Sequence, residues 1–331
     1  FAGSGLLLAN GARGYTDGGN RGGGGGGGRI AVVYDPAAQS AQNAVAKPIV
    51  QLGANAGQCY LGANVDETTY NGQPGTIYLT DGSFLFTPVM QGGQYIAPGF
   101  TSTTVSSLIV SNGLAIFTNA LQIAISNDLT MASDFAGLSL TDAVLRVGGN
   151  VSVSCPAYAF SYLGCRAGSS FGVTNNFTVG PRYTLRYYGC DTNASSLEIG
   201  GNLVTTNGAR FYLYSGMTNG VSPDHGNLVA VTGGIVATSN SWILPNSHPT
   251  NGGSALFRAA YVSIPHSSGG FDASGGGFRG GIMAGTNGAG PGGGSNAWVS
   301  SGAGYGGRGG RSVGSVGGRT YRSAAVPLDP G

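Results

Sequence analysis

Three copies of a short glycine-centred pattern constrain the fold of this chain more than any other feature. Each copy is a short β-branched run, a Gly-Gly pair and a second short alternating run, as expected of a strand, a tight corner and the next strand. The copies span residues 145–153, 197–205 and 229–237, and their Gly-Gly pairs lie 52 and then 33 residues apart. This self-similarity predicts a β-solenoid whose corners carry loops of unequal length.

Short strands are also predicted outside these copies. Runs of about three to five β-forming residues are separated by Asn, Asp and Gly, which suits a solenoid because its corners favour residues that tolerate positive φ. The predicted strands cover 30–34, 49–52, 76–80, 84–86, 108–110, 114–117 and 123–125. Residues 37–47, whose Ala and Gln spacing suits a helix, form the single helix that we expect.

Composition divides the 331 residues into three parts. Residues 1–29 form a glycine-rich N-terminal arm, and 30–265 form an all-β domain with the architecture of a parallel β-helix. Residues 266–331 form a glycine-rich C-terminal segment, in which 22 of the 50 positions from 269 to 318 are glycine. No Gly-x-y register holds there, which excludes a collagen triple helix.

The seven consecutive glycines at 22–28 have two interpretations. One is a flexible linker, because glycine has no side chain to bury. The other is an ordered segment packed against extended neighbours, because glycine lets backbones approach closely and pair their amides. A phosphate-binding loop is excluded, since no Gly-Lys-Ser/Thr follows and the next residues read as a strand.

The segment 155–190 is expected to be an aromatic-rich insertion in the β-helix. Its aromatic residues stand beside Arg182 and Arg186, so they suit stacking on sugar rings or on a partner. The simpler alternative is a packed loop that shields the side of the solenoid. The aromatic residues are Tyr158, Phe160, Tyr162, Phe171, Phe177, Tyr183, Tyr187 and Tyr188.

Charge restricts the surroundings and the partners of the chain. Charged residues make up 8%, against about 25% in a typical soluble domain. This deficit suits a protein held in a fibre or matrix, although an unassembled secreted β-protein has the same character. The net charge of +2, without any Lys/Arg cluster along the sequence, argues against nucleic acid. Residues 1–10 are too short and too broken by glycine for a membrane span or signal peptide, so we expect a processed product or a piece of a longer polypeptide.

Cysteine, histidine and asparagine give three further expectations. The four cysteines allow three pairings. We expect Cys155 to pair with Cys165, because these two flank one loop, and this leaves Cys59 to pair with Cys190. None forms a CxxC pair and only three histidines are present, so no metal or other cofactor is expected.

The Asn-x-Ser/Thr triplets make three asparagines possible glycan acceptors. They are Asn150, Asn176 and Asn193.

No catalytic signature emerges. Asp66 and Glu67 are adjacent, so on an extended segment their side chains point to opposite faces, unlike a glycosidase pair. No acidic cluster suggests the calcium site of a polysaccharide lyase, and Asp224-His225 has no assignable nucleophile. A polysaccharide lyase or hydrolase therefore stays only as an alternative to a non-enzymatic protein. Too few Thr residues are aligned to predict an ice-binding face.

Several low-complexity motifs together resemble a known class of protein. They are the glycine run leading into Arg29-Ile30-Ala31-Val32, the stretch 74–79, the Gly-Gly-Asn-Leu copy, the stretch 304–310 and the end 327–331. This combination resembles large, repetitive, glycine-rich β-helix proteins of bacterial cell surfaces. The resemblance implies secretion, right-handed parallel coils and a structural or adhesive role, and it supplies no catalytic residues. Members are usually very long, whereas this chain has one unit between two glycine-rich ends.

These observations predict an extracellular structural protein that assembles with copies of itself into a filament or surface layer. Open solenoid ends invite pairing, and the glycine-rich ends are expected to pack between protomers. Extracellular polysaccharide is the other expected partner, with carbohydrate binding as the alternative function. The residues expected to contribute to assembly are Gly22, Gly25, Gly28, Arg21, Arg29, Trp298, Tyr305 and Arg308.

Overall fold

The computed structural model describes most of the chain. The described residues are 1–17, 20–46, 48–57, 72–84, 89–90, 92–97, 99, 101–111, 113–118, 120–132, 135–154, 160–166, 168–189, 195–221, 223–279, 286–295 and 308–320. Within them the structure is nearly all β, with parallel sheets and one α-helix, as the sequence predicts.

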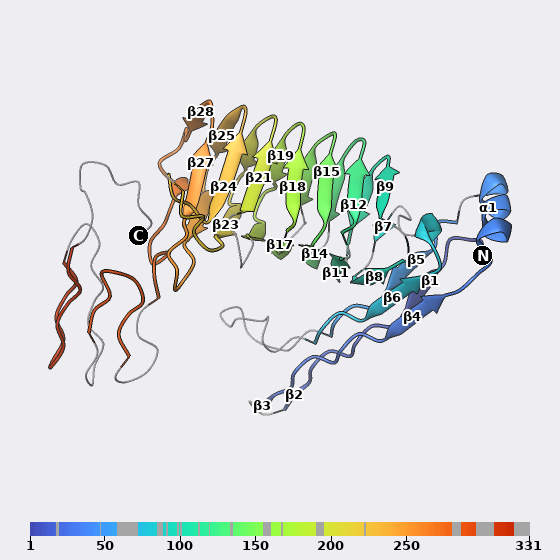
Figure 1. Cartoon of the computed structure of the whole chain (residues 1–331), viewed down its shortest axis with the longest axis horizontal. Coiled ribbons are helices and arrows are strands. Elements are labelled where there is room, and N and C mark those ends of the chain that lie inside the picture. The colour runs from blue at the N-terminus through green and yellow to red at the C-terminus, as the bar shows by residue number, and fades with distance from the viewer. Residues whose placement is uncertain are drawn as a thin grey trace.

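Three parallel sheets run the length of the molecule (Figure 1). Sheet 1 contains β7 (Val89–Met90), β10 (Leu108–Val110), β13 (Leu129–Ala132), β16 (Val151–Ser154), β19 (Phe177–Val179), β22 (Leu203–Thr205), β25 (Gly234–Ala237) and β28 (Tyr261–Ser263). Sheet 2 contains β4 (Arg29–Val32), β6 (Thr76–Leu79), β8 (Gly93–Ile96), β11 (Gly113–Phe117), β14 (Phe135–Thr141), β17 (Phe160–Arg166), β20 (Thr184–Tyr188), β23 (Arg210–Tyr214), β26 (Trp242–Asn246) and β29 (Gly270–Phe271).

Sheet 3 completes the arrangement. It contains β9 (Ser102–Val105), β12 (Gln122–Ile125), β15 (Val144–Val147), β18 (Ser170–Val173), β21 (Ser195–Ile199), β24 (Asn227–Val231) and β27 (Ala255–Arg258). From β7 onward each strand pairs with the strand three places along the chain, so one circuit through sheets 1, 2 and 3 makes a coil. This path is compatible with the predicted parallel solenoid.

Alternating burial along each strand fills the space between the sheets. In β24, for example, Asn227, Val229 and Val231 are buried and the residues between them are partly exposed. Register places inward residues of successive coils above one another, so Val151, Phe177, Leu203 and Ile235 form one fully buried column. Such columns remove apolar surface from water in every coil, which is the main stabilisation of the fold.

The Gly-Gly corners follow from crowding rather than from positive φ. Gly148 and Gly149 are not among the positive-φ residues, whereas a Cβ on Gly149 would lie 2.5 Å from the carbonyl oxygen of Asn127 in the preceding coil. Positive φ occurs instead at the corners that lead into sheet 3 and into sheet 2, two residues before the next strand begins. The residues there are Ala120, Asp142, Gly168, Arg182, Gly208 and Asn240. Glycine at the Gly-Gly corners therefore serves close packing of coils.

The segment 155–190 is not an insertion within its described part, which corrects the sequence-based expectation. Strands β17, β18, β19 and β20 take their places in sheets 2, 3 and 1, paired on both sides with neighbouring coils. Some of its aromatic side chains point inward and are fully buried. These are Phe171, Phe177, Tyr183 and Tyr187. The apparent interruption is a continuation of the core.

A second layer, built from glycine-rich backbone, extends from the first coils. We define this glycine-rich layer as residues 9–15, 22–28, 53–57 and 72–75, whose described segments run side by side in Figure 1. The amides of Gly22, Gly25 and Gly28 donate to the carbonyl oxygens of Tyr15, Ala12 and Ala9, at 2.8, 2.8 and 2.6 Å. This three-residue spacing is that of polyproline II helices, which have no internal hydrogen bonds. The run 22–28 is thus packed rather than a linker.

The N-terminal end also contains the predicted helix, α1 (Pro36–Val45). Asp35 begins it by accepting hydrogen bonds from the amides of Ala37 and Ala38, at 2.8 and 3.2 Å, and proline follows at the first helical position. The remaining elements are β1 (Leu6–Leu8) paired with β5 (Gln51–Gly53), β2 (Thr16–Asp17) paired with β3 (Asn20–Arg21), and the short 3₁₀ helix η2 (Gly82–Phe84).

Two tyrosines buried in the coils predict a loss of stability in alkaline solution. Burial raises the pKa of Tyr95 and of Tyr187 above 10, and the neighbouring Cys165 raises that of Tyr187 further. Above about pH 10 the unfolded chain loses these protons while the folded chain keeps them, so the unfolding free energy falls with pH, by about 1.4 kcal/mol per unit for each tyrosine. Urea titrations from pH 9 to 11.5 measure how steeply the unfolding free energy falls with pH. Tyr95→Phe should make this fall less steep by about 1.4 kcal/mol per pH unit, which corresponds to one proton. Tyr15→Phe, at an exposed position, should leave the steepness unchanged.

Candidate functional site

A ladder of Asx side chains joins successive coils at the corner between sheets 3 and 1. The Oδ1 atom of Asp128 accepts from the amide of Asn150, that of Asn150 from the amide of Asn176, and that of Asn176 from the amide of Asn202, at 2.7, 3.3 and 2.9 Å. The Oδ1 atom of Asn202 in turn accepts from the amide of Gly234 at 2.7 Å. The ladder satisfies corner amides that the sheets leave unpaired.

Two of the predicted glycan acceptors belong to this ladder. The Nδ2 atoms of Asn150 and Asn176 donate to Asp128 and Asn150, at 3.2 and 3.4 Å. A glycan on either nitrogen would compete with these bonds, so their structural role is evident while their modification stays a prediction. Asn193 lies outside the described residues.

Asn176→Ala is expected to destabilise the coils by about 2 kcal/mol. The change removes the acceptor of the Asn202 amide and one donor to Asn150, and a part-buried polar group without a partner costs about 1–3 kcal/mol. Chemical denaturation monitored by circular dichroism measures the loss. Asn175→Ala is the matched control, because Asn175 is the exposed neighbour at the same corner. Equal losses in the two variants would contradict a role for the ladder.

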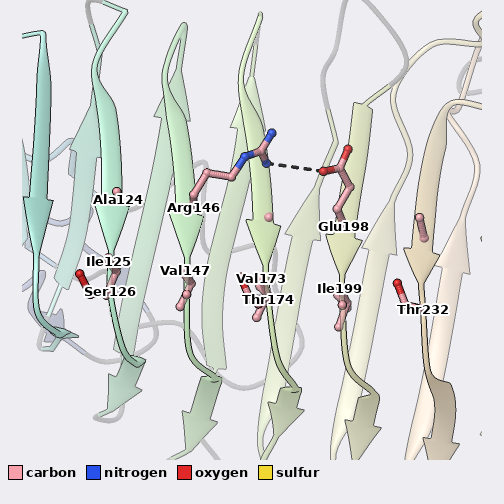
Figure 2. Close-up of a pocket in the computed structure, with 14 residues that line it drawn as sticks. Ala124, Ile125, Ser126, Arg146, Val147, Val173, Thr174, Glu198, Ile199 and Thr232 are labelled. Carbon is pink, nitrogen blue, oxygen red and sulfur yellow. Dashed lines mark ion pairs between the residues drawn. The ribbon is translucent and has the colours of Figure 1, made fainter.

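A shallow groove of about 570 Å³ crosses the outer face of sheet 3. Its floor includes the small residues Ala124, Gly172 and Ala230, which share one outward row with Arg146 and Glu198. Figure 2 shows Arg146 reaching across β18 toward Glu198, with 3.8 Å between Nη1 and Oε2. Gly172 makes this possible, since a Cβ there would contact the arginine at 2.5 Å.

The chemistry available in this groove is limited. Both ends of the ion pair are about half exposed, so it contributes little to stability. The described lining contains one carboxylate, whereas hydrolysis of a glycosidic bond ordinarily requires two. Across the described residues, no three His, Cys, Asp or Glu side chains are grouped as metal ligands. The groove is therefore a surface feature without a recognisable catalytic arrangement.

The outer face of sheet 2 carries aromatic and basic side chains. The rings of Tyr162, Tyr188 and Tyr214 stack along successive coils, with centroid distances of 5.0 and 4.6 Å. Arg186 lies in register between Tyr162 and Tyr212. Sequence reasoning noticed the aromatics and the arginines, but only the coil register brings them to one face.

A second cleft, of about 510 Å³, lies at the corner leading into this face. Arg182 and Arg210 line it from adjacent coils, on either side of Gly208. The other side chains that line it are polar and uncharged, and none of the described lining residues is acidic. They are Thr184, Asn207, Ser239 and Asn240.

The predicted disulfides receive no support from the described cysteine. Cys165 is fully buried on an inward position of β17, beside Tyr187, and it forms no disulfide in the structure. An inward-facing thiol packs as a small apolar side chain, which explains its presence without a bridge. Cys59, Cys155 and Cys190 lie outside the described residues.

The predicted assembly residues divide into two groups. The amides of Gly22, Gly25 and Gly28 donate within the glycine-rich layer, and their contribution to assembly stays a prediction. Arg29 and Arg308 are exposed, and Arg21 lies in β3. Trp298 and Tyr305 lie outside the described residues.

Comparison with known proteins supplies no relative. Neither family models, nor curated proteins, nor solved structures match the chain. In the part of the chain that the structure describes, no helix has the length and hydrophobicity needed to span a membrane. Any account of function therefore depends on the geometry of the molecule itself.

Proposed function

We propose that the protein is a secreted structural subunit, a right-handed parallel β-helix with glycine-rich arms, that joins copies of itself end to end into an extracellular filament or surface layer. The observation that carries the proposal is the exposure of apolar side chains on the terminal strands of both ends. Leu6, Leu7 and Leu8 of β1 are 59, 38 and 51% exposed. Tyr261 and Val262 of β28 are 53 and 55% exposed.

The inward rows of the coils are also unfinished at both ends. Val105 in β9 and Phe257 in β27 are only partly buried, whereas their register partners Ile125 and Val229 are 1 and 0% exposed. A further coil on each side would bury them as the internal coils bury theirs. Terminal coils of a solenoid require such a cover, either a cap or another molecule.

A second copy of the chain is the occupant that fits these ends. At the N-terminal end β1 pairs with β5, which packs beside β7 of sheet 1, and at the other end sheet 1 finishes at β28. The β1–β5 pair is parallel, as are the strands of sheet 1, and β28 of one copy would add to β1 of the next in the same way. Contacts between unlike ends repeat indefinitely unless they close into a ring.

The remaining features are consistent with an extracellular matrix role. The chain has few charges, so repulsion between copies is weak. Several amides of its glycine-rich layer bond within the layer, which extends away from the coils and adds surface for lateral contacts (Figure 1). Helix α1 lies at the N-terminal end and still leaves Leu6, Leu7 and Leu8 exposed.

The test is the oligomeric state of the full chain. Sedimentation velocity and negative-stain imaging should show rods that lengthen with concentration. Val262→Asp and Leu7→Asp place a charge on the two end strands and should each leave the chain monomeric and folded. Val221→Asp is the matched control, because Val221 is 64% exposed in the loop between β23 and β24 rather than on an end strand. A wild-type chain that stays monomeric at high concentration would overturn the proposal.

A further inference from the structure

Four arginines lie on or beside the outer face of sheet 2. Arg166, Arg186 and Arg210 come from β17, β20 and β23, and Arg182 stands two residues before β20. The outward described positions of these strands and of β26 include no Asp or Glu. Among these described positions the charged side chains are therefore all basic. We call this surface the basic face.

The cleft at its edge holds two of these charges close together. Arg182 and Arg210 are both exposed and belong to adjacent coils: the amide of Arg210 donates to the carbonyl oxygen of Tyr183 at 2.8 Å. Gly208, which has no side chain, leaves open space beside the Cγ of Arg182. Both guanidinium groups are positively charged, so an anion bound in the cleft would be attracted by both.

We propose that this cleft binds the anionic group, a carboxylate or sulfate, of an acidic polysaccharide. Guanidinium groups match the geometry of such oxyanions and bind them through paired hydrogen bonds. The hydroxyl groups of Thr184 and Ser239 and the amides of Asn207 and Asn240 supply donors and acceptors for sugar hydroxyls beside the anion. A polysaccharide that continued from this cleft across the face, parallel to the strands, would pass Arg186 in the middle of β20 and then Arg166 at the last residue of β17.

The aromatic residues favour a polysaccharide over a nucleic acid. Single-stranded nucleic acids bind to aromatic platforms whose ring faces are open to the bases. Here Tyr188 and Tyr214 are stacked 4.6 Å apart at 11°, so they cover each other's faces. The stacked rings therefore present their edges more than open faces, which disfavours base stacking.

This inference does not depend on end-to-end assembly. The basic face lies along the side of the coils, whereas the exposed β1 and β28 strands lie at their ends (Figure 1). A monomer would present the same cleft, so failure of either proposal leaves the other standing.

Binding of the full chain to defined polysaccharides tests the inference. Isothermal titration at low ionic strength should detect polygalacturonate or dextran sulfate, which identifies the preferred anion, and should detect no binding of neutral dextran. Affinity should fall as salt is added. Replacing both Arg182 and Arg210 with Gln should weaken binding at least about tenfold, since each removes a charge-assisted interaction.

The matched control removes one charge elsewhere. Arg258→Gln changes an exposed arginine on the outward row of sheet 3 and should alter affinity less than about twofold. Replacing both cleft arginines with Lys should retain part of the affinity, because the charge stays and the paired geometry is lost. The inference is overturned if neither anionic polymer binds, if the Gln variant binds as the wild type does, or if single-stranded DNA binds more tightly than both polymers.

Discussion

Replacing Gly27 with valine is expected to open the glycine-rich layer while the coils stay folded. A Cβ at Gly27 would overlap the carbonyl oxygen of Ala54 and the amide nitrogen of Gly75. Both obstacles are backbone atoms of neighbouring segments, so the layer relieves the overlap only by separating. The cost should reach roughly 3 kcal/mol, or about a hundredfold in the local opening equilibrium.

Hydrogen exchange reads this effect segment by segment. Amides of the layer, such as that of Gly25, should lose protection, while amides of internal strands such as β19 keep it. Gly26→Val is the matched control in the same run, since the atom nearest its Cβ position is the Gln73 carbonyl oxygen at 3.9 Å. Equal effects of the two changes would contradict the packed arrangement and restore the flexible linker.

Local sequence signals predicted many of the strands and the helix, because strand alternation and helix-favouring composition act over a few residues. The Ala and Gln spacing of residues 37–47 predicted α1. Short runs such as 108–110 are strands in the structure, as predicted. Parallel pairing of consecutive coils followed from the repeated corner, since copies of one unit stack in register.

The Gly-Gly pairs alone do not reveal every coil in the sequence. The residue common to the corners between sheets 3 and 1 is the Asn or Asp of the ladder. Asn176 occupies the ladder position after Thr174-Asn175, so a search for Gly-Gly pairs passes over this coil. Its inclusion resolves the 52-residue gap into two steps of 26. Each corner needs a side-chain oxygen that accepts a hydrogen bond from the backbone amide of the next coil. The composition of the corner does not show which Asn or Asp does this.

The candidate binding cleft could not be predicted because coil lengths vary. Ladder residues are separated by 22, 26, 26 and 32 positions, so no fixed spacing reports which side chains become neighbours. Arg182 and Arg210 meet across one coil although 28 positions separate them. For the same reason the basic face was invisible in a sequence that has no Lys/Arg cluster.

The largest loss of stability is expected from Phe177→Ala, at about 3–5 kcal/mol. Phe177 is fully buried in β19, and its ring lies 6.2 Å from the rings of both Phe171 and Phe211. It therefore joins sheet 3 and sheet 2 to the buried column of sheet 1, and its removal leaves a cavity that three sheets would have to close together. Thermal unfolding followed by circular dichroism should show a large decrease in the midpoint.

The pattern of the loss should also reveal how the coils cooperate. In a solenoid each coil contacts only its neighbours, so a cavity in one coil weakens two interfaces and lowers the barrier to splitting the stack there. Hydrogen exchange should accordingly increase most in β16, β19 and β22, and less in β10 and β25. Thr178→Ala, on the outward side of the same strand, should change stability by less than about 0.5 kcal/mol. A uniform increase across all coils in Phe177→Ala would show instead that the whole stack unfolds as one unit.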